Sequence, residues 1–207
     1  MKRKPILLKR LLGNHAGGGK RTIGLIGVNR GAGVTYTGML LAYYFSREKG
    51  LRTSYLECNS HLDFSLMQEA YEWNEEDEYS FSLDGITYYK QVTKSQIPDL
   101  INSNYDCCIM DFGIDFINAR DEFIRCSNKI VVADRAIWNQ SKTIEFFKTI
   151  VDTRGSMKWI CMIPFSNQSE VMELSRIIDK SIDVIPFEPD PTSLSKETCK
   201  LFCNLFG

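Results

Sequence analysis

The chain has 207 residues, of which 43% are hydrophobic, and a formal net charge of -1. This length fits one domain with a full-sized core and leaves little room for two. The near-neutral charge gives no whole-molecule attraction for nucleic acid, because phosphate binding needs a clustered positive field. The sequence also lacks an apolar run of the roughly 20 residues that a membrane-spanning helix needs.

The cysteines and the first residues both indicate a cytoplasmic protein. The seven cysteines form no Cys-x-x-Cys pair, and several lie in apolar runs such as 105–110. That spacing argues against zinc and thioredoxin-like sites and is typical of buried, reduced thiols. The apolar stretch near the N-terminus is interrupted by Lys9 and Arg10, which does not fit a signal peptide. We therefore expect the chain to stay inside the cell.

Residues 1–13 predict a short basic amphipathic helix ahead of the domain. Its apolar stripe consists of Leu7, Leu8, Leu11 and Leu12, and its basic residues are Lys2, Arg3, Lys4, Lys9 and Arg10. Residues 14–19 form a glycine-rich linker, and the domain runs from 20 to 207. Two interpretations stay open for the helix: peripheral contact of residues 2–12 with an anionic membrane surface, or packing on this domain or a partner protein.

From residue 20 onward, strand patterns alternate with helix patterns. Strands are expected at 22–28, 52–58, 85–90, 106–111, 129–133, 158–163 and 182–185. Helices are expected at 34–49, 94–101, 117–126, 137–153, 168–179 and 192–206, with an irregular acidic stretch at 69–78. Such alternation predicts an α/β fold, a doubly wound and mostly parallel sheet with helices on both faces.

A glycine loop, residues 29–33, connects the first strand to the first helix of the domain. This arrangement binds phosphate in many proteins, because loop N–H groups and the helix N-terminus converge on the anion. Glycines at 27, 31 and 33 let the main chain approach a ligand closely. A plain strand-to-helix turn is the alternative. The dinucleotide spacing Gly-x-Gly-x-x-Gly fails, because Tyr36 stands at the last position.

The stretch from Asn29 to Thr35 (NRGAGVT) resembles the deviant Walker A loop of the ParA/MinD family, K-G-G-x-G-K-[ST]. Two glycines and the hydroxyl of Thr35 are kept. The signature lysine falls on Asn29, and the lysine that grips the phosphates falls on Val34. The resemblance thus implies a phosphate-binding loop that has lost both lysine charges.

Three further segments continue the resemblance in the right order. The segment 56–59 (LECN) is similar to the second strand of the family, which ends in Asp-x-Asp, and Glu57 keeps one carboxylate. The segment 105–113 (YDCCIMDFG) resembles the Walker B strand with Asp111 at its end. The segment 183–190 resembles the late Ile-Pro-x-Asp segment whose backbone flanks the adenine, and 127–132 resembles the strand between them.

The resemblance implies a set of site residues. Those for the nucleotide are Asn29, Arg30, Gly31, Ala32, Gly33, Val34, Thr35, Tyr36, Pro186 and Phe187. Those for Mg²⁺ are Thr35, Glu57 and Asp111, and the two carboxylates are also the candidates for a catalytic role. The cofactors implied are ATP or ADP with Mg²⁺, or none if the loop has kept only its shape.

Loss of the lysines predicts poor hydrolysis or none, because catalysis of phosphoryl transfer depends on positioning and charge. Our first hypothesis is a degenerate member of the family, a localisation or assembly scaffold such as the TadZ/CpaE pilus proteins. It would act through homodimerisation and protein contacts near the membrane. The alternative is an active ATPase in which Arg30 replaces the lysine, serving pilus assembly, partition or cell positioning. A DNA-binding partition protein is disfavoured by the mild acidity.

Overall fold

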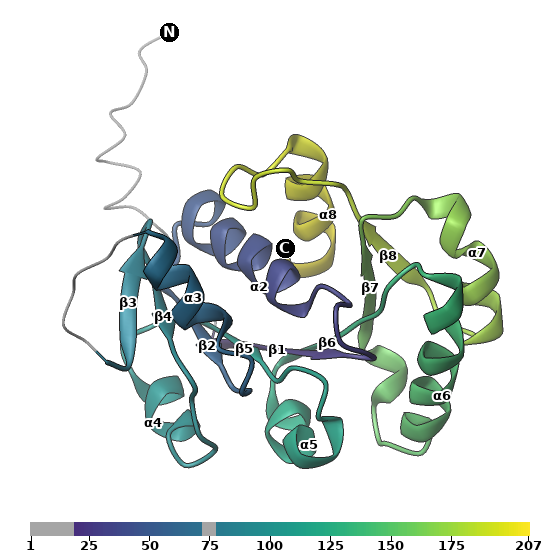
Figure 1. The fold of residues 1–207 in the computed structure, drawn as a ribbon, viewed down its shortest axis with the longest axis horizontal. Helices are drawn as coiled ribbons and strands as arrows, with labels where there is room; N and C mark the ends of the chain where they lie inside the picture. The colour runs from purple at the N-terminus through teal and green to yellow at the C-terminus, as the bar shows by residue number, and fades with distance from the viewer. Residues whose placement is uncertain (1–18, 72–77) are drawn as a thin grey trace, which may run out of the picture.

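The computed structural model describes residues 19–71 and 78–207. The expected helix 1–13, nearly all of the linker 14–19 and most of the acidic stretch 69–78 lie outside the described residues, so these expectations stay predictions. The described strands form one eight-stranded sheet in the order β3-β4-β2-β5-β1-β6-β7-β8 (Figure 1). Neighbouring strands run parallel except for the antiparallel pair β3 and β4. The predicted α/β fold is confirmed.

The strands and helices follow the expected alternation. The strands are β1 (Arg21–Gly27), β2 (Thr53–Glu57), β3 (Ser80–Leu83), β4 (Ile86–Tyr89), β5 (Cys107–Asp111), β6 (Asn128–Val132), β7 (Ile160–Pro164) and β8 (Ile182–Ile185). The α-helices are α2 (Val34–Tyr43), α3 (Asp63–Ala70), α4 (Ile97–Asn102), α5 (Phe116–Arg125), α6 (Gln140–Ile150), α7 (Gln168–Ile177) and α8 (Lys196–Phe206). Shorter turns are η1 (Tyr44–Glu48, a π-helix), η2 (Ile137–Asn139) and η3 (Ser156–Lys158).

Helices cover both faces of the sheet, so the core lies in two layers. Helices α2 and α8 lie on one face, and α4 and α5 lie on the other (Figure 1). Strand β1 faces both layers: Leu25 packs with the α2 side, and its neighbour Ile26 packs with the α5 side. A strand buried on both faces is apolar at nearly every position, which explains the continuous run TIGLIG.

Two elements were missed by the sequence patterns, the helix α3 and the strand β3. Strand β3 is a four-residue edge strand whose Phe81 and Leu83 are buried, while Ser82 between them is exposed. Helix α3 has a weak apolar pattern, and only Phe64 of its residues is buried. Both elements are short, so the periodic signal that reveals an element over many residues is absent from them.

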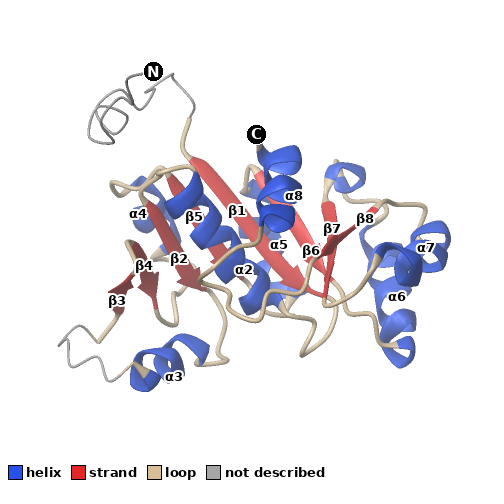
Figure 2. Ribbon diagram, turned by 90° about the horizontal axis from the view of Figure 1, so that it is seen from above, coloured by secondary structure: helices blue, strands red, loops and turns tan. Residues whose placement is uncertain are grey.

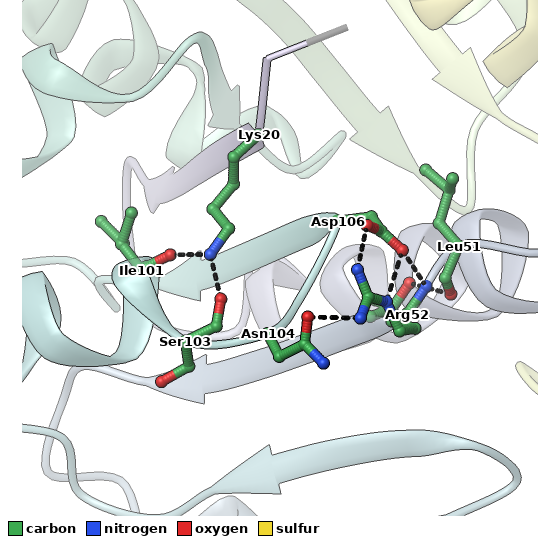
Figure 3. A network of polar contacts seen from close by, with 8 residues as sticks. Lys20, Leu51, Arg52, Ile101, Ser103, Asn104 and Asp106 are labelled. Carbon is green, nitrogen blue, oxygen red and sulfur yellow. Dashed lines mark hydrogen bonds and ion pairs between the residues drawn. The ribbon is translucent and has the colours of Figure 1, made fainter. Parts of the chain in front are cut away.

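Polar contacts anchor the amino ends of the central strands (Figure 3). The ammonium group of Lys20 donates to the backbone carbonyls of Ile101 and Ser103 at the end of α4. Beside it, the guanidinium of Arg52 pairs with the carboxylate of Asp106 at 2.7 Å. A cation at the C-terminus of a helix donates to carbonyls that have no partner in the helix. It also interacts favourably with the negative end of the helix dipole. The contact therefore fixes the start of β1 relative to α4.

Figure 2 shows the sheet from above, with β1 among its central strands. The carboxyl end of β1 leads into the glycine loop, residues 29–33. Across residues 19–71 and 78–207, none of the helices is both long enough and apolar enough to cross a membrane.

Candidate functional site

The glycine loop lies at the carboxyl end of β1, between β5 and β6. After β1 the chain passes to β2, which lies toward one edge of the sheet. After β5 it crosses β1 to β6, which lies toward the opposite edge. Connections that diverge in this way open a crevice at the carboxyl ends of the strands, where ligands bind in open α/β sheets. The sequence therefore places its most glycine-rich turn at the favoured position of the fold.

The backbone of the loop is shaped for a close approach. Gly31 and Gly33 have φ angles of 82° and 92°, which strain any residue with a Cβ atom. Gly33 caps α2 without a side chain, so the first N–H groups of α2 remain open toward the loop. A cavity of about 300 Å³ follows, lined by every residue from Asn29 to Tyr36 and by His61, Asp63 and Ile114. Pro186 and Phe187 do not belong to this lining.

Val34, where the resemblance to the family expects a lysine, has a packed apolar side chain. Only 8% of the residue is exposed. A Cβ atom added at Gly27 would lie 2.6 Å from Cγ2 of Val34, so the two residues are in close contact. The side chain thus joins the end of β1 to the start of α2. It contributes packing at a place where a phosphate would need positive charge.

Three side chains from three elements meet beside the loop, and we call them the acid–hydroxyl cluster (Thr35, Asp63 and Asp111). The hydroxyl of Thr35 lies 2.8 Å from Oδ2 of Asp111 and 2.9 Å from Oδ2 of Asp63. A hydroxyl carries one hydrogen and donates to one acceptor at a time. One of the two carboxylates is therefore left facing a lone pair, and the cluster has more negative charge than its own donors satisfy.

Burial sharpens this imbalance. Asp111 is only 1% exposed, and burial raises the pKa of its carboxyl group, while hydrogen bonds from the Gly113 N–H and the Thr35 hydroxyl lower it. Hard divalent cations bind to such oxygen atoms, and Mg²⁺ uses one or two carboxylates together with phosphates and water. Among residues 19–71 and 78–207, no three or more His, Cys, Asp or Glu side chains gather as a metal site. The two carboxylates and the hydroxyl of the cluster are oxygen ligands of the kind that Mg²⁺ prefers.

Comparisons with known proteins decide the fold. No protein-family model and no curated protein matches the sequence. Among solved structures, a plasmid partition protein of Borrelia burgdorferi bound to AMPPNP superposes with a TM-score of 0.65 at 11% identity, covering 90% of this chain and 96% of that one. A ParA family ATPase of Chlorobium tepidum gives 0.59 at 15% identity, with coverages of 82% and 85%. A chain of the MinC:MinD cell division protein complex of Aquifex aeolicus gives 0.61 at 12% identity, with 82% of both chains covered.

The chain has the ParA/MinD fold. This confirms the resemblance at the level of the fold, and the identities of 11% to 15% carry it no further. The roles assigned to single residues stay predictions.

Asp63 is a site residue that the sequence patterns missed. It opens helix α3, and Leu62 before it adopts a φ of 65°. Such a conformation is costly for a bulky residue and is often found at functional sites. It turns the start of α3 so that the carboxylate of Asp63 reaches Thr35 across the ParA/MinD crevice. An acidic residue shortly after a strand end was the only available signal, and no local pattern announced α3.

Glu57 was predicted as a ligand of Mg²⁺, and the structure directs its carboxylate elsewhere. Its oxygens accept hydrogen bonds from the backbone N–H groups of Phe64 and Gln91, each at 3.3 Å. Burial raises the pKa of Glu57, and these backbone donors oppose the rise. Glu57 lies opposite Asp111 in the sheet but does not line the loop cavity. It holds the start of α3 in place, and its role at the metal stays a prediction.

Aromatic rings border the loop on the side of β7 and β8. The ring of Tyr36 lies 4.5 Å from that of Phe165, which lies 6.0 Å from that of Phe187. The hydroxyl of Tyr36 donates to the carbonyl of Glu188 at 2.9 Å and accepts from its N–H at 3.0 Å. The segment 186–188 is thereby tied to α2. The ring of Phe187 contacts that of Phe165, which in turn contacts Tyr36 of the loop cavity. Binding of an adenine at Phe187 stays a prediction.

Proposed function

We propose that this chain binds ATP or ADP with Mg²⁺ weakly, hydrolyses ATP poorly or not at all, and acts in the cytoplasm as a localisation or assembly scaffold. The observation that carries the proposal is the contrast within one crevice. The acid–hydroxyl cluster is present beside the loop, while the buried Val34 takes the place of the charge that catalysis needs.

In this proposal, the phosphates and Mg²⁺ are held by different groups of the crevice. Open N–H groups of the loop and the start of α2 hold the phosphates. Thr35 and Asp111 hold Mg²⁺, which supplies positive charge to the phosphates when it is bound. The ammonium group that would stabilise charge on the transferred phosphoryl is missing, and loss of one such group costs about 3 kcal/mol. Binding is therefore retained at reduced affinity, and turnover is lost first.

Thermal unfolding with millimolar nucleotide tests this proposal. We expect ATP and ADP to raise Tm only when Mg²⁺ is present, because ligand at ten times its Kd contributes about 1.4 kcal/mol. No shift with any nucleotide contradicts retained binding. ATP turnover that the Asp111→Ala change abolishes contradicts the scaffold and favours an ATPase.

Arg30 supports the second candidate, an active ATPase. It is exposed in the loop and lines the same cavity as Thr35. A guanidinium group binds phosphate oxygens in a planar, bidentate manner. We predict that Arg30→Ala lowers the affinity for Mg–ADP about tenfold, since a hydrogen bond to a charged group contributes about 1.5 kcal/mol or more. Isothermal titration calorimetry measures the change.

Arg135→Ala is the matched control for this measurement. Arg135 pairs with Glu170 at 3.8 Å, and more than half of the Arg135 side chain is exposed. Equal affinities of Arg30→Ala and the wild-type protein would remove the rescue by Arg30, and with it the ATPase candidate.

Exposed apolar side chains around the crevice support protein contacts and a homodimer. They lie in the loops and turns that follow β5, β6, β7 and β8 and in the first turn of α5: Ile114, Ile117, Ile137, Trp138, Phe165 and Phe187. Ile117, Ile137 and Trp138 are each more than 75% exposed. Apolar side chains gathered near a polar crevice are typical of interaction sites. Sedimentation velocity with and without Mg–ATP tests the dimer, and a monomer under every condition contradicts it.

The membrane contact rests on residues 2–12, which lie outside the described residues. Co-sedimentation with anionic vesicles tests it. We expect binding that falls with added salt and is lost on deletion of residues 1–13. Salt-dependent binding to DNA by the full chain would contradict the prediction that nucleic acid is not a partner.

A further inference from the structure

Asp134 connects the glycine loop to the turn that follows β6. One oxygen of its carboxylate, Oδ2, accepts a hydrogen bond from Nδ2 of Asn29 at 2.6 Å and a second from Nδ2 of Asn139 at 2.7 Å. The other oxygen, Oδ1, accepts from the N–H of Ala136 at 2.8 Å. A single carboxylate thus binds the loop with one bond and its own turn with two. We call residues 134–139 the Asp134 turn.

We propose that Asp134 is a positioning residue of the glycine loop, which it holds through Asn29, and that this bond couples the loop to the exposed side chains of the Asp134 turn. The proposal deepens the proposed function, because it names what regulates the same loop, and it rests on that function for its purpose. The hydrogen bonds that carry the coupling are present in the ligand-free protein, so the coupling can be tested without a nucleotide.

Asn29 is the residue through which the loop is held. Only 7% of it is exposed. Its amide nitrogen donates to the carboxylate of Asp134 and to the carbonyl of Arg30 at 2.9 Å, and its backbone carbonyl accepts from the N–H of Ala32 at 3.3 Å. The first residues of the loop are therefore bound around one buried side chain. A change in the position of Asn29 moves the backbone that lines the cavity.

The orientation of the Asn29 amide shows that Asp134 determines it. Oδ1 of Asn29 is buried and has no hydrogen-bond partner within the described part of the chain. Buried polar atoms are nearly always paired, so an unpaired one needs a cause. The opposite orientation of the amide would place Oδ1 against the carboxylate of Asp134, and two acceptors would then be in contact. The carboxylate accordingly keeps the amide in an orientation that leaves one of its own atoms unsatisfied.

The Asp134 turn carries the residues that the coupling would move. Ile137 and Trp138 are 76% and 77% exposed, and both lie in η2 between the two bonds that Asp134 makes to Ala136 and Asn139. A carboxylate that shifts with Asn29 shifts these bonds as well, because all of them end on the same group. The exposed apolar pair therefore changes position when the loop adjusts to an anion.

Asn29→Ala and Asp134→Ala test the coupling in the ligand-free protein by hydrogen exchange. Asn29→Ala removes the bond to the turn and the bond to the carbonyl of Arg30 within the loop, and it leaves both bonds within the turn in place. Asp134→Ala removes the bond to the loop and both bonds within the turn. We expect each variant to speed amide exchange in the loop about tenfold, a factor typical of one lost hydrogen bond to a charged group. We also expect Asn29→Ala to speed exchange in the Asp134 turn, which it does not otherwise touch. In the Asp134 turn, the double variant should then match Asp134→Ala.

Two further measurements complete the test. Arg135→Ala, a surface variant within the same turn, should leave exchange in the loop unchanged. Asn29→Asp sets two carboxylates against each other, and adding Asp134→Asn should restore slow exchange in the loop because a donor again faces an acceptor. This pair of changes keeps the shape of both side chains and guards against unfolding as the cause.

The outcomes separate the proposal from the proposed function. Faster exchange in the Asp134 turn of Asn29→Ala, with recovery by the exchanged pair, supports the coupling even in a protein that binds no nucleotide. Unchanged exchange in that turn overturns it, because Asp134 would then only stabilise its own turn. If nucleotide binds, Mg–ADP should change Trp138 emission, measured as the difference from Trp138→Phe, in the wild-type protein and not in Asn29→Ala. An equal change in both proteins also overturns the coupling.

Discussion

Gly38→Ala is expected to lower the free energy of unfolding by about 3 kcal/mol, the upper end of the usual range for overpacking a core. A Cβ atom at this position of α2 would lie 1.9 Å from the hydroxyl oxygen of Tyr55 and 2.3 Å from its Cζ. Tyr55 is fully buried, so the ring has no open space to enter. In an exposed helix the same change would stabilise by up to about 1 kcal/mol, and here the contact reverses the sign.

The effect should extend to the site. The hydroxyl of Tyr55 donates to the carbonyl of Thr35 at 3.1 Å and lies 3.4 Å from Oδ2 of Asp111. Displacement of the ring therefore disturbs two members of the acid–hydroxyl cluster. Urea unfolding measures the loss of stability, with Gly19→Ala as the control because a Cβ atom there meets nothing within 4 Å. A Gly38→Ala protein as stable as the wild type would show that α2 and β2 are packed less closely than described.

This contact marks the limit of what the sequence could predict. The apolar run of β1 and the position of Asp111 at the end of β5 are local patterns, and both predicted their elements correctly. The contact of Gly38 with Tyr55 joins two elements through the register of the sheet, which no local pattern encodes. The sequence shows a glycine at position 38 within a helical segment, but the need for it comes from the ring of Tyr55 in β2.

The candidate site divides in the same way. The sequence shows directly that residue 34 carries no charge, whereas the packing of Val34 against Gly27 could be seen only in the fold. Asp63 enters the cluster through the unusual backbone of Leu62, and Asp134 reaches the loop from a different strand end. Residues that reach a site because of an unusual backbone conformation, or from a distant strand end, have no characteristic spacing in the sequence that would mark them. The glycine loop could be predicted because all of its parts are consecutive.

Asp111→Asn is expected to have opposite effects on the empty protein and on binding. With the amide oxygen kept on the Gly113 N–H, the change places an NH2 donor where Oδ2 now competes for the hydrogen of Thr35. It also removes a charge on a residue that is 1% exposed. The ligand-free variant should therefore unfold at a higher Tm than the wild type. The same change removes a carboxylate of the proposed Mg²⁺ site, so Mg–ADP affinity should fall by about tenfold to a hundredfold, the range that corresponds to about 1.5–3 kcal/mol. Sites that hold unsatisfied charge for a ligand commonly show this opposition between stability and function.

The pH dependence of stability tests independently whether the charge of Asp111 destabilises the ligand-free protein. Burial raises the pKa of Asp111 above its ordinary value of 3.8, so the native state binds more protons than the unfolded state between the two pKa values. Stability is then greatest below the unfolded value and falls as the pH rises through the native pKa. Asp111→Asn should reduce this fall, and the raised pKa of Glu57 should keep part of it. A steeper fall in the variant would contradict the assignment of the charge to Asp111.

Asp183→Asn separates burial from metal binding. Asp183 lies in β8 away from the loop cavity, and burial alone raises the pKa of its carboxyl group. This variant should share the stabilising sign of Asp111→Asn, because it too removes a desolvated charge, and it should leave Mg–ADP affinity unchanged. Calorimetric titration of both variants therefore distinguishes two explanations of Asp111. Equal loss of affinity in both would mean that charge acts over the whole sheet, and loss in Asp111→Asn alone places the Mg²⁺ ligand at the end of β5.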